Sequence, residues 1–237
     1  MNPEHTMNHG TLYTFYSARY LLLIAMLFMT MLLAGTAVAY KIVTIGWFTL
    51  PACSVLFPIT YALGDVITEV YGYAIMRQLI WFSVICGYVF MFVIMLALHL
   101  PSPIYWHAQD AFNTVFKNTW LFTTMATIGM VFGAFLNSYA IAKWKVLLKG
   151  KYFWLRSLGA TFLGDFAHVT IVAIFAFSPI VPLSQLPKLI ISMYSYRILY
   201  AILAVWPANV TANFLKRSEN IDIYDSKTNF NPFALKK

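Results

Sequence analysis

The sequence has few charged residues for its length. Asp, Glu, Lys and Arg make up 10% of its 237 residues, whereas hydrophobic residues make up 61%. A soluble domain carries roughly 25% charged residues, because its surface must be hydrated. A chain with less than half of that proportion cannot cover a water-exposed globule, so we expect an integral membrane protein.

Cysteine is also scarce, and the motifs of several protein classes are missing. Cys53 and Cys86 both lie in apolar stretches, so neither a disulfide framework nor a thiolate zinc site is expected. The sequence has no Walker A motif, so we do not expect the chain itself to hydrolyse ATP. The net charge of +8 comes from segments that flank apolar stretches rather than from one basic face, so nucleic acid is not an expected partner.

Long apolar runs are abundant. A helix that crosses ~30 Å of hydrocarbon needs about 20 mainly apolar residues. Five stretches meet this requirement, and a sixth is short and contains Pro51, Pro58 and Gly64, which predicts a bent or interrupted helix. We therefore expect an all-α polytopic membrane protein in which residues 1–237 form a single transmembrane domain. Its predicted spans are 20–40, 47–64, 78–98, 119–142, 157–178 and 188–214, followed by a polar tail at 215–237.

The distribution of Lys and Arg predicts the orientation of these spans. Six spans put both termini on one side of the membrane, and the segments on that side contain twelve of the sixteen basic residues. The opposite loops contain only Lys41, Lys117 and Lys188, and Arg197 lies inside a span. Because basic residues accumulate on the cytoplasmic side, both termini should be cytoplasmic.

Ionisable residues inside spans are costly and therefore usually functional. Asp165 and His168 share one face of the fifth span, and Arg197 lies on the sixth. Counting about 1.5 Å per residue from the span ends places Arg197 and His168 at similar depths, with Asp165 one helical turn away. A purely structural interpretation stays open, in which Asp165 and Arg197 simply join two helices by a salt bridge.

Asp65 and Glu69 form a second ionisable set near the end of the short span. They are four residues apart and would share one face of a helix. One interpretation is that they have a gating or coupling role at the cytoplasmic end. The other is that they are solvated there or paired with Arg77.

Aromatic residues make up 18% of the chain. A planar heterocycle needs ring faces for stacking and a few polar groups for its edges, and Phe57 and Tyr61 beside the proline-containing segment are candidates for stacking. His168 has no other His or Cys nearby in the sequence, so neither a metal site nor a cofactor is expected. The predicted substrate-binding residues are Phe57, Tyr61, Asn137, Asp165, His168, Tyr194 and Arg197.

Four segments of the sequence are specific enough to indicate a family. The longest runs from Phe57 to Tyr73 and reads FPITYALGDVITEVYGY; the others are FLNSY at 135–139, WLRS at 154–157, and the tail with DIYD at 222–225 and TNFNPF at 228–233. Together they resemble the queuosine precursor transporters, also called the vitamin uptake transporter family, and the resemblance extends from Tyr16 to Phe233. It implies six spans in the inner membrane and import of 7-deazaguanine bases such as preQ0, preQ1 or queuine for tRNA modification.

The sequence departs from the family pattern within the predicted binding residues. Family members usually carry glutamine in place of Ala134 and of Asp165, and aspartate in place of His168. They often carry asparagine in place of Thr36 and lysine in place of Arg197. The resemblance therefore leaves the preferred base open.

Three functional hypotheses follow. The chain is a transporter that works alone by alternating access, or the substrate-capture subunit of an energy-coupling-factor importer with partner ATPases. The third is an intramembrane enzyme that uses Asp165 and His168 as an acid–base pair, but no G-x-S-x-G nucleophile motif supports it, so no enzyme is expected. The expected partners are a small planar heterocyclic base and the lipid bilayer, and association into a homodimer is left open.

Overall fold

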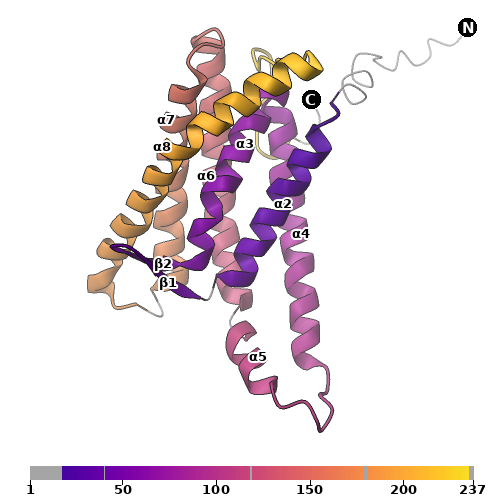
Figure 1. The fold of residues 1–237 in the computed structure, drawn as a ribbon, viewed down its shortest axis with the longest axis vertical. Helices are drawn as coiled ribbons and strands as arrows, with labels where there is room; N and C mark the ends of the chain where they lie inside the picture. The colour runs from indigo at the N-terminus through magenta and orange to yellow at the C-terminus, as the bar shows by residue number, and fades with distance from the viewer. Residues whose placement is uncertain (1–17, 40, 118, 179–180, 235–237) are drawn as a thin grey trace, which may run out of the picture.

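The protein is a bundle of long helices. The computed structural model describes residues 18–39, 41–117, 119–178 and 181–234. It contains six helices that are long and apolar enough to cross a membrane, which confirms the predicted all-α polytopic fold. They are formed by α2 (Leu21–Val38), α3 (Phe57–Tyr71), α4 (Tyr73–His99), α6 (Thr119–Leu147), α7 (Phe153–Val172) and α8 (Leu186–Glu219) (Figure 1). Residues 1–17 and 235–237 of the predicted domain lie outside the described ranges, and so does Tyr16, where the family resemblance begins.

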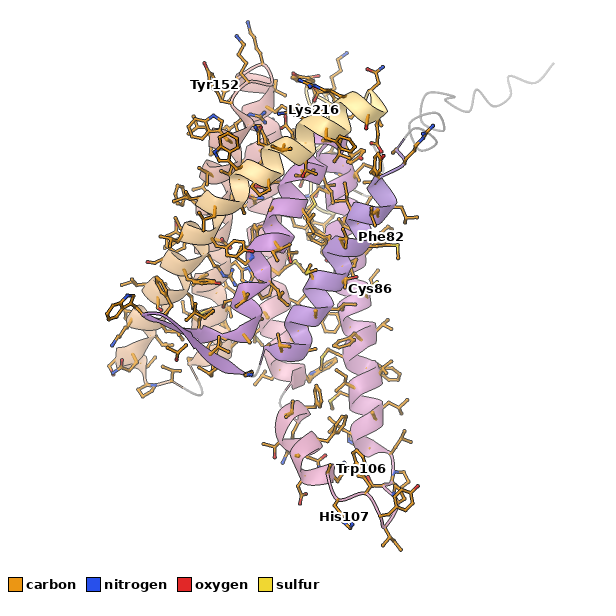
Figure 2. All side chains as sticks on the ribbon, in the orientation of Figure 1. Phe82, Cys86, Trp106, His107, Tyr152 and Lys216 are labelled. Atoms are coloured by element: carbon orange, nitrogen blue, oxygen red, sulfur yellow. The ribbon has the colours of Figure 1, made fainter. Side chains whose placement is uncertain are left out.

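Apolar side chains cover the outside of this bundle. Along α4, Phe82, Ile85, Val89 and Phe92 are 58–65% exposed, and Figure 2 shows Phe82 and Cys86 on an outer face of the bundle. A helix that is apolar on every side is suited to a lipid environment. The protein is therefore a multi-pass membrane protein.

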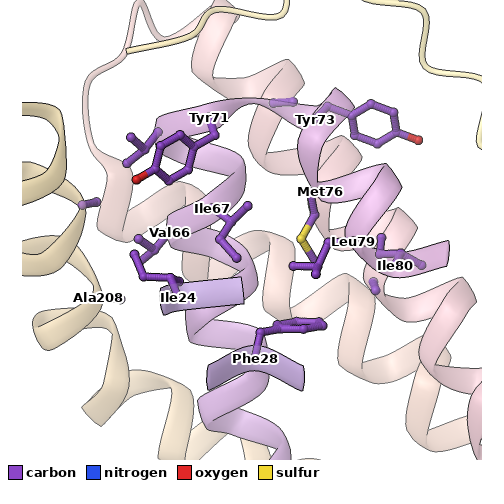
Figure 3. Packing of buried hydrophobic residues seen from close by; sticks show 14 of the residues in the cluster. Ile24, Phe28, Val66, Ile67, Tyr71, Tyr73, Met76, Leu79, Ile80 and Ala208 are labelled. Atoms are coloured by element: carbon purple, nitrogen blue, oxygen red, sulfur yellow. The ribbon is translucent and has the colours of Figure 1, made fainter. Parts of the chain in front are cut away.

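Helix α3 lies at the centre of the bundle. It packs against α2, α4, α6, α7 and α8. Val66 and Ile67 of α3 meet Phe28 of α2 and Met76 and Ile80 of α4 in one buried apolar cluster (Figure 3). The polar residues of α3 are therefore enclosed by protein rather than exposed to lipid.

The second span begins and ends later than the predicted 47–64. Residues 42–51 form a hairpin of β1 (Ile42–Ile45) and β2 (Phe48–Pro51), joined by a two-residue turn in which Gly46 has φ +57°. The membrane-spanning segment is Ala52–Tyr71, and it consists of a 3-10 turn at Ala52–Val55 followed by α3. Pro58 lies in the first turn of α3, where its missing N–H has no partner to lose.

The shift has a physical reason. Hydropathy alone predicts that the span ends at Gly64, because the acidic residues Asp65 and Glu69 follow it in the sequence. Both acids are accommodated inside the helix because hydrogen-bond donors on α6 and α7 reach them. Pairing between distant segments therefore extends the span to Tyr71, about two turns beyond the predicted end.

Other segments also differ from the expected ends. Helix α8 extends to Glu219 and contains Pro207, and α7 continues as a π-helical segment, Ala173–Phe177. The predicted loop 99–118 contains a further helix, α5 (Gln109–Phe116), and Leu183–Gln185 forms a 3-10 turn before α8.

The two ends of the bundle differ in charge. Figure 1 shows that α2 begins and α8 ends at the same end, as an even number of crossings requires. We call it the basic end, because Lys145, Arg156 and Lys216 lie there. The opposite end, which holds the β-hairpin and α5, is called the hairpin end. The assignment of the basic end to the cytoplasm stays a prediction.

Candidate functional site

Two glycines bring α6 and α7 into close contact beside α3. A Cβ atom at Gly133 would lie 2.4 Å from the hydroxyl oxygen of Tyr61 and 2.7 Å from the carbonyl oxygen of Gly164. A Cβ at Gly164 would in turn lie 2.7 Å from the carbonyl oxygen of Gly133. Small residues allow such close approach of helices within membranes. As a result, the Tyr61 side chain of α3 reaches the facing side of α7.

A polar cluster lies next to this contact. The Tyr61 hydroxyl is 3.2 Å from Nδ1 of His168 on α7. Arg197 of α8 donates from Nη1 to Oδ1 of Asp165 at 3.0 Å, and the same nitrogen is 3.3 Å from Nδ1 of His168. Asp165, His168 and Arg197 are each 1% exposed. The structure therefore brings together the three residues that depth counting placed at similar levels.

Phe57 forms one wall of the cluster. Its ring meets the His168 ring edge-on, with the centroids 5.1 Å apart and the planes at 88°. The guanidinium carbon of Arg197 lies 4.9 Å from the centroid of the Phe57 ring, a cation–π contact that is stronger in a desolvated site. Aromatic faces and charged edges thus meet at one point in the bundle.

The hydrogen bonds of His168 fix its tautomer. A guanidinium nitrogen can only donate, so Nδ1 of His168 must accept from Arg197. A neutral ring then carries its proton on Nε2. That buried nitrogen has no hydrogen-bond partner within the described part of the chain. The cluster therefore offers one unused N–H donor.

Asp65 borders the same hollow as Asp165, but its hydrogen-bond donors are neutral polar groups. Its Oδ1 accepts a hydrogen bond from Nδ2 of Asn137 at 2.5 Å. Its Oδ2 accepts from the Ser157 hydroxyl and, at 3.5 Å, from the Thr161 hydroxyl. Asp65 is 1% exposed, so the interpretation that it is solvated at the mouth of the bundle is wrong.

Glu69 belongs to a different network at the basic end. Arg156 donates to both of its carboxylate oxygens, at 2.6 and 3.0 Å, and Lys216 donates to Oε1 at 2.5 Å. Lys145 lies 3.9 Å from the same oxygen. The alternative expectation of a pair with Arg77 is wrong for Glu69, because the Arg77 guanidinium donates to the tail, including the carbonyl oxygen of Asn229 at 2.6 Å.

Tyr194 lies apart from the other predicted binding residues. It is partly exposed, and its hydroxyl donates to the backbone carbonyl of Phe162 at 3.1 Å. Its ring packs edge-on against Phe166. The sequence placed Tyr194 one turn from Arg197, and both side chains contact α7, but the Tyr194 hydroxyl bonds to the Phe162 carbonyl rather than to the polar cluster.

Sequence reasoning missed Ser157 and Thr161. Both lie on the face of α7 that carries Asp165, at four-residue spacing, and this regular spacing was the available signal. It also missed Gly133 and Gly164, whose role depends on how α6 and α7 cross.

The cluster is closed to a ligand of the size of a nucleobase. The hollow bordered by Tyr61, Asp65 and Asp165 is about 10 Å³, and the one bordered by Cys53 and Phe57 is about 30 Å³. Ligand pockets typically measure roughly 300–1,000 Å³. Binding of a heterocycle here therefore requires the helices to move apart.

Comparison with known proteins identifies one family. A family model described as "Putative vitamin uptake transporter" matches residues 51–211. The match begins at the second span and ends within α8, so it includes Phe57, Asp65, Asp165 and Arg197. No curated protein and no solved structure matches the chain significantly.

Proposed function

The chain belongs to the vitamin uptake transporter family, also called the queuosine precursor transporter family, and from this premise we propose that it imports a 7-deazaguanine base. The base would be preQ0, preQ1 or queuine, taken up across the inner membrane for tRNA modification. Membership of a transporter family favours this function over the intramembrane enzyme hypothesis.

The single observation that carries the proposal is the composition of the buried cluster. Phe57 and His168 supply ring faces, Asp165 supplies a carboxylate, and Arg197 supplies a guanidinium group. A guanine-like base has one edge with adjacent N–H donors and a carbonyl acceptor beside it. A carboxylate binds such donors by charge-assisted hydrogen bonds, and a guanidinium group binds the carbonyl in the same way.

Binding in this position exchanges one set of partners for another. Asp165 and Arg197 pair with each other while the cluster is closed. When the base enters between them, Asp165 accepts from its N–H edge and Arg197 donates to its carbonyl oxygen. The buried charges therefore keep partners in both states, which limits the cost of separating them.

The two acids of α3 have different proposed roles. Glu69 holds α3 to α7 and α8 through Arg156 and Lys216 at the basic end, so we assign it to a gate on the proposed cytoplasmic side. Asp65 forms no ion pair with the residues that the structure describes and borders the same hollow as Asp165, so we assign it to coupling.

The test is uptake of labelled preQ0 or preQ1 by cells that express this gene and lack their own synthesis and uptake of these bases. We expect uptake with the wild-type chain, and loss of uptake with Asp165→Asn while the variant stays in the membrane at normal amounts. Asp110→Asn in α5, which neutralises an exposed carboxylate, is the matched control and should transport normally. Undiminished uptake by Asp165→Asn would reject the assignment of Asp165.

The same cells separate a lone transporter from a capture subunit. A chain that works alone supports uptake without partner ATPases, whereas an energy-coupling-factor capture subunit does not. Thermal-shift screening of the purified protein against 7-deazaguanines, guanine, adenine and several vitamins identifies the preferred ligand. Stabilisation by a vitamin but by none of the bases would overturn the proposed substrate class.

A further inference from the structure

Asp65 differs from the other acids inside the bundle in its partners. Asp165 pairs with Arg197, and Glu69 pairs with Arg156 and Lys216. No ion pair involves Asp65 among the residues that the structure describes. A buried carboxylate without a cation is costly, by several kcal/mol even after relaxation. A positively charged partner at Asp65 would therefore lower this cost.

The groups around Asp65 are neutral oxygen-bearing side chains. Ser157 and Thr161 contribute hydroxyl groups from α7, and Asn137 contributes an amide from α6. The amide oxygen of Asn137 is buried and has no hydrogen-bond partner within the described ranges. Asn137 itself is only 3% exposed. Asn137 borders a neighbouring hollow with Tyr61, so the oxygens that face the hollow beside Asp65 are its carboxylate and the two hydroxyl groups. These are hard ligands, which suit a small cation.

The space beside Asp65 limits the size of that cation. The hollow bordered by Asp65, Ser157 and Thr161 is about 10 Å³. A cavity needs roughly 10–15 Å³ to hold one water molecule. The hollow is therefore close to the size of a single small ion or water molecule and far too small for a heterocycle.

The charged groups that face Asp65 leave an excess of negative charge. Helix α7 brings Asp165 and His168, α8 brings Arg197, and α3 itself brings Tyr61 one turn away. Helix α2 has no ionisable side chain, and α6 brings the neutral amide of Asn137. Glu69, one turn further along α3, is paired at the basic end with its own cations, which are Arg156 of α7, Lys145 of α6 and Lys216 of α8. Arg77 of α4 donates to the tail. With His168 neutral, two carboxylates share one guanidinium group. One added positive charge makes the set neutral.

We propose that Asp65, with the hydroxyl groups of Ser157 and Thr161, binds a monovalent cation, either a proton or Na⁺, that drives uptake, while the Asn137 amide positions the carboxylate. The cation site is inferred from the contacts above, whereas the coupling of cation binding to uptake rests on the proposed function. Asp65 and Asp165 border the same hollow, so a cation at Asp65 changes the field at the carboxylate proposed to bind the base. Such coupling is reciprocal: the cation raises affinity for the base, and the base raises affinity for the cation.

Cation binding is tested first on the purified protein without any base. Its melting temperature is measured from pH 5 to pH 8 and, separately, as K⁺ is replaced by Na⁺ at constant ionic strength. We expect stabilisation by Na⁺ if that ion binds, or by protons if a proton binds. Asp65→Asn should abolish the shift, and Thr161→Val, which keeps the carboxylate, should move it to a several-fold higher cation concentration.

Asp225→Asn is the matched control, because Asp225 is also buried but accepts its hydrogen bonds from Tyr73 and Thr228 at the basic end. It should keep the wild-type shift. If neither cation moves the wild-type melting temperature, or if Asp65→Asn responds as the wild type does, the proposal is wrong. If Asp65→Asn does not fold, Thr161→Val decides, and an unchanged response then overturns the proposal.

Transport is tested in liposomes that contain the purified protein. With one cation per base and no membrane potential, about a tenfold inward gradient of the correct ion should drive about a tenfold accumulation of labelled preQ1. Base uptake that responds to neither a Na⁺ nor a proton gradient overturns the coupling while the proposed function stands. A cation shift through Asp65 without uptake of any base leaves the cation site standing while the proposed function fails.

Discussion

Single residues decide how closely the helices around the site can pack. At Gly133 the missing side chain allows the Tyr61 hydroxyl to lie between α6 and α7 and to reach His168. A glycine within a helix often makes the backbone locally flexible. Here its role is steric, because three different elements converge on the space that a Cβ atom would fill.

We expect Gly133→Ala to destabilise the protein by about 1–3 kcal/mol, the usual cost of overpacking. The new Cβ would lie 2.4 Å from the Tyr61 hydroxyl oxygen and 2.9 Å from Cβ of His168. The measurement is the thermal unfolding of both forms in one detergent. Gly87→Ala is the control, because a Cβ at Gly87 meets no atom within 4 Å, and it should not lower the melting temperature. Equal melting temperatures for Gly133→Ala and the wild type would contradict the steric argument.

Among the elements, the C-terminal tail determines how the basic end is closed. Helix α8 ends at Glu219, and the tail then returns across the junction of α3 and α4. The Ile223 N–H donates to the Val70 carbonyl oxygen at 3.1 Å, and Trp81 donates to the Pro232 carbonyl oxygen at 2.8 Å. The segment predicted as a polar tail thus packs in part against α3 and α4.

The ion pairs of the tail meet the Glu69 network at Asp222. Lys145 donates to its Oδ1 at 2.6 Å, and Lys216 lies 3.0 Å from the same oxygen. Partial burial alone would raise the pKa of the Asp222 carboxyl, but the hydrogen bonds from the two lysines lower it below the usual value. The tail and the proposed gate therefore share two cations.

A lowered pKa predicts how the contribution of Asp222 depends on pH. A carboxyl whose pKa is lower in the folded state stabilises that state above its unfolded pKa of about 3.9 and loses this effect as the pH falls through the folded value. The difference in melting temperature between wild type and Asp222→Asn should therefore be constant from pH 8 to pH 5 and should shrink below about pH 4. A difference that vanishes near neutral pH would contradict the ion pairs. Asp110→Asn, an exposed carboxylate of α5, should show little difference at any pH.

For the whole molecule, the structure is a closed state of the proposed transport cycle. The polar cluster is buried, the hollows beside it are far smaller than a nucleobase, and the Glu69 network and tail close the basic end. A bound ligand shifts such an equilibrium only by its different affinity for the open and closed states. The rate at which a reagent reaches buried side chains is therefore a direct measure of how often the helix bundle opens.

Cys53 is a natural reporter of this opening. It is 3% exposed and borders the same hollow as Phe57. In a Cys86→Ser variant, a water-soluble maleimide should label Cys53 slowly, and a saturating base stacked on Phe57 should slow it further by covering the thiol. Mass spectrometry of the labelled protein gives the rate.

The control is Cys86, which is exposed on α4. In a Cys53→Ser variant, a lipid-soluble maleimide should label it at a rate that the base does not change. Labelling of Cys53 at the same rate with and without base would argue against a site at Phe57.

The membrane class and the helical fold could be predicted from the sequence, because they depend on composition summed over long windows. A run of about 20 apolar residues can satisfy its backbone in lipid only as a helix. The convergence of Asp165, His168 and Arg197 was also predictable, since depth along a straight helix follows from counting residues. The second span was predicted too early in the sequence. A prediction from hydropathy assumes that acidic residues such as Asp65 and Glu69 face water.

Only the tertiary structure could distinguish the two acids of α3. They are one helical turn apart in the same motif, so the sequence suggests one shared role. Glu69 meets Arg156 and Lys216, which come from two other helices, whereas the hydrogen bonds that Asp65 accepts within the described segments come from hydroxyl and amide groups. The sequence thus determined which residues are buried in the membrane, through local hydrophobicity and helical spacing. Their partners depend on contacts between distant segments, because the crossing of α6 and α7 at Gly133 and Gly164 sets which side chains can meet.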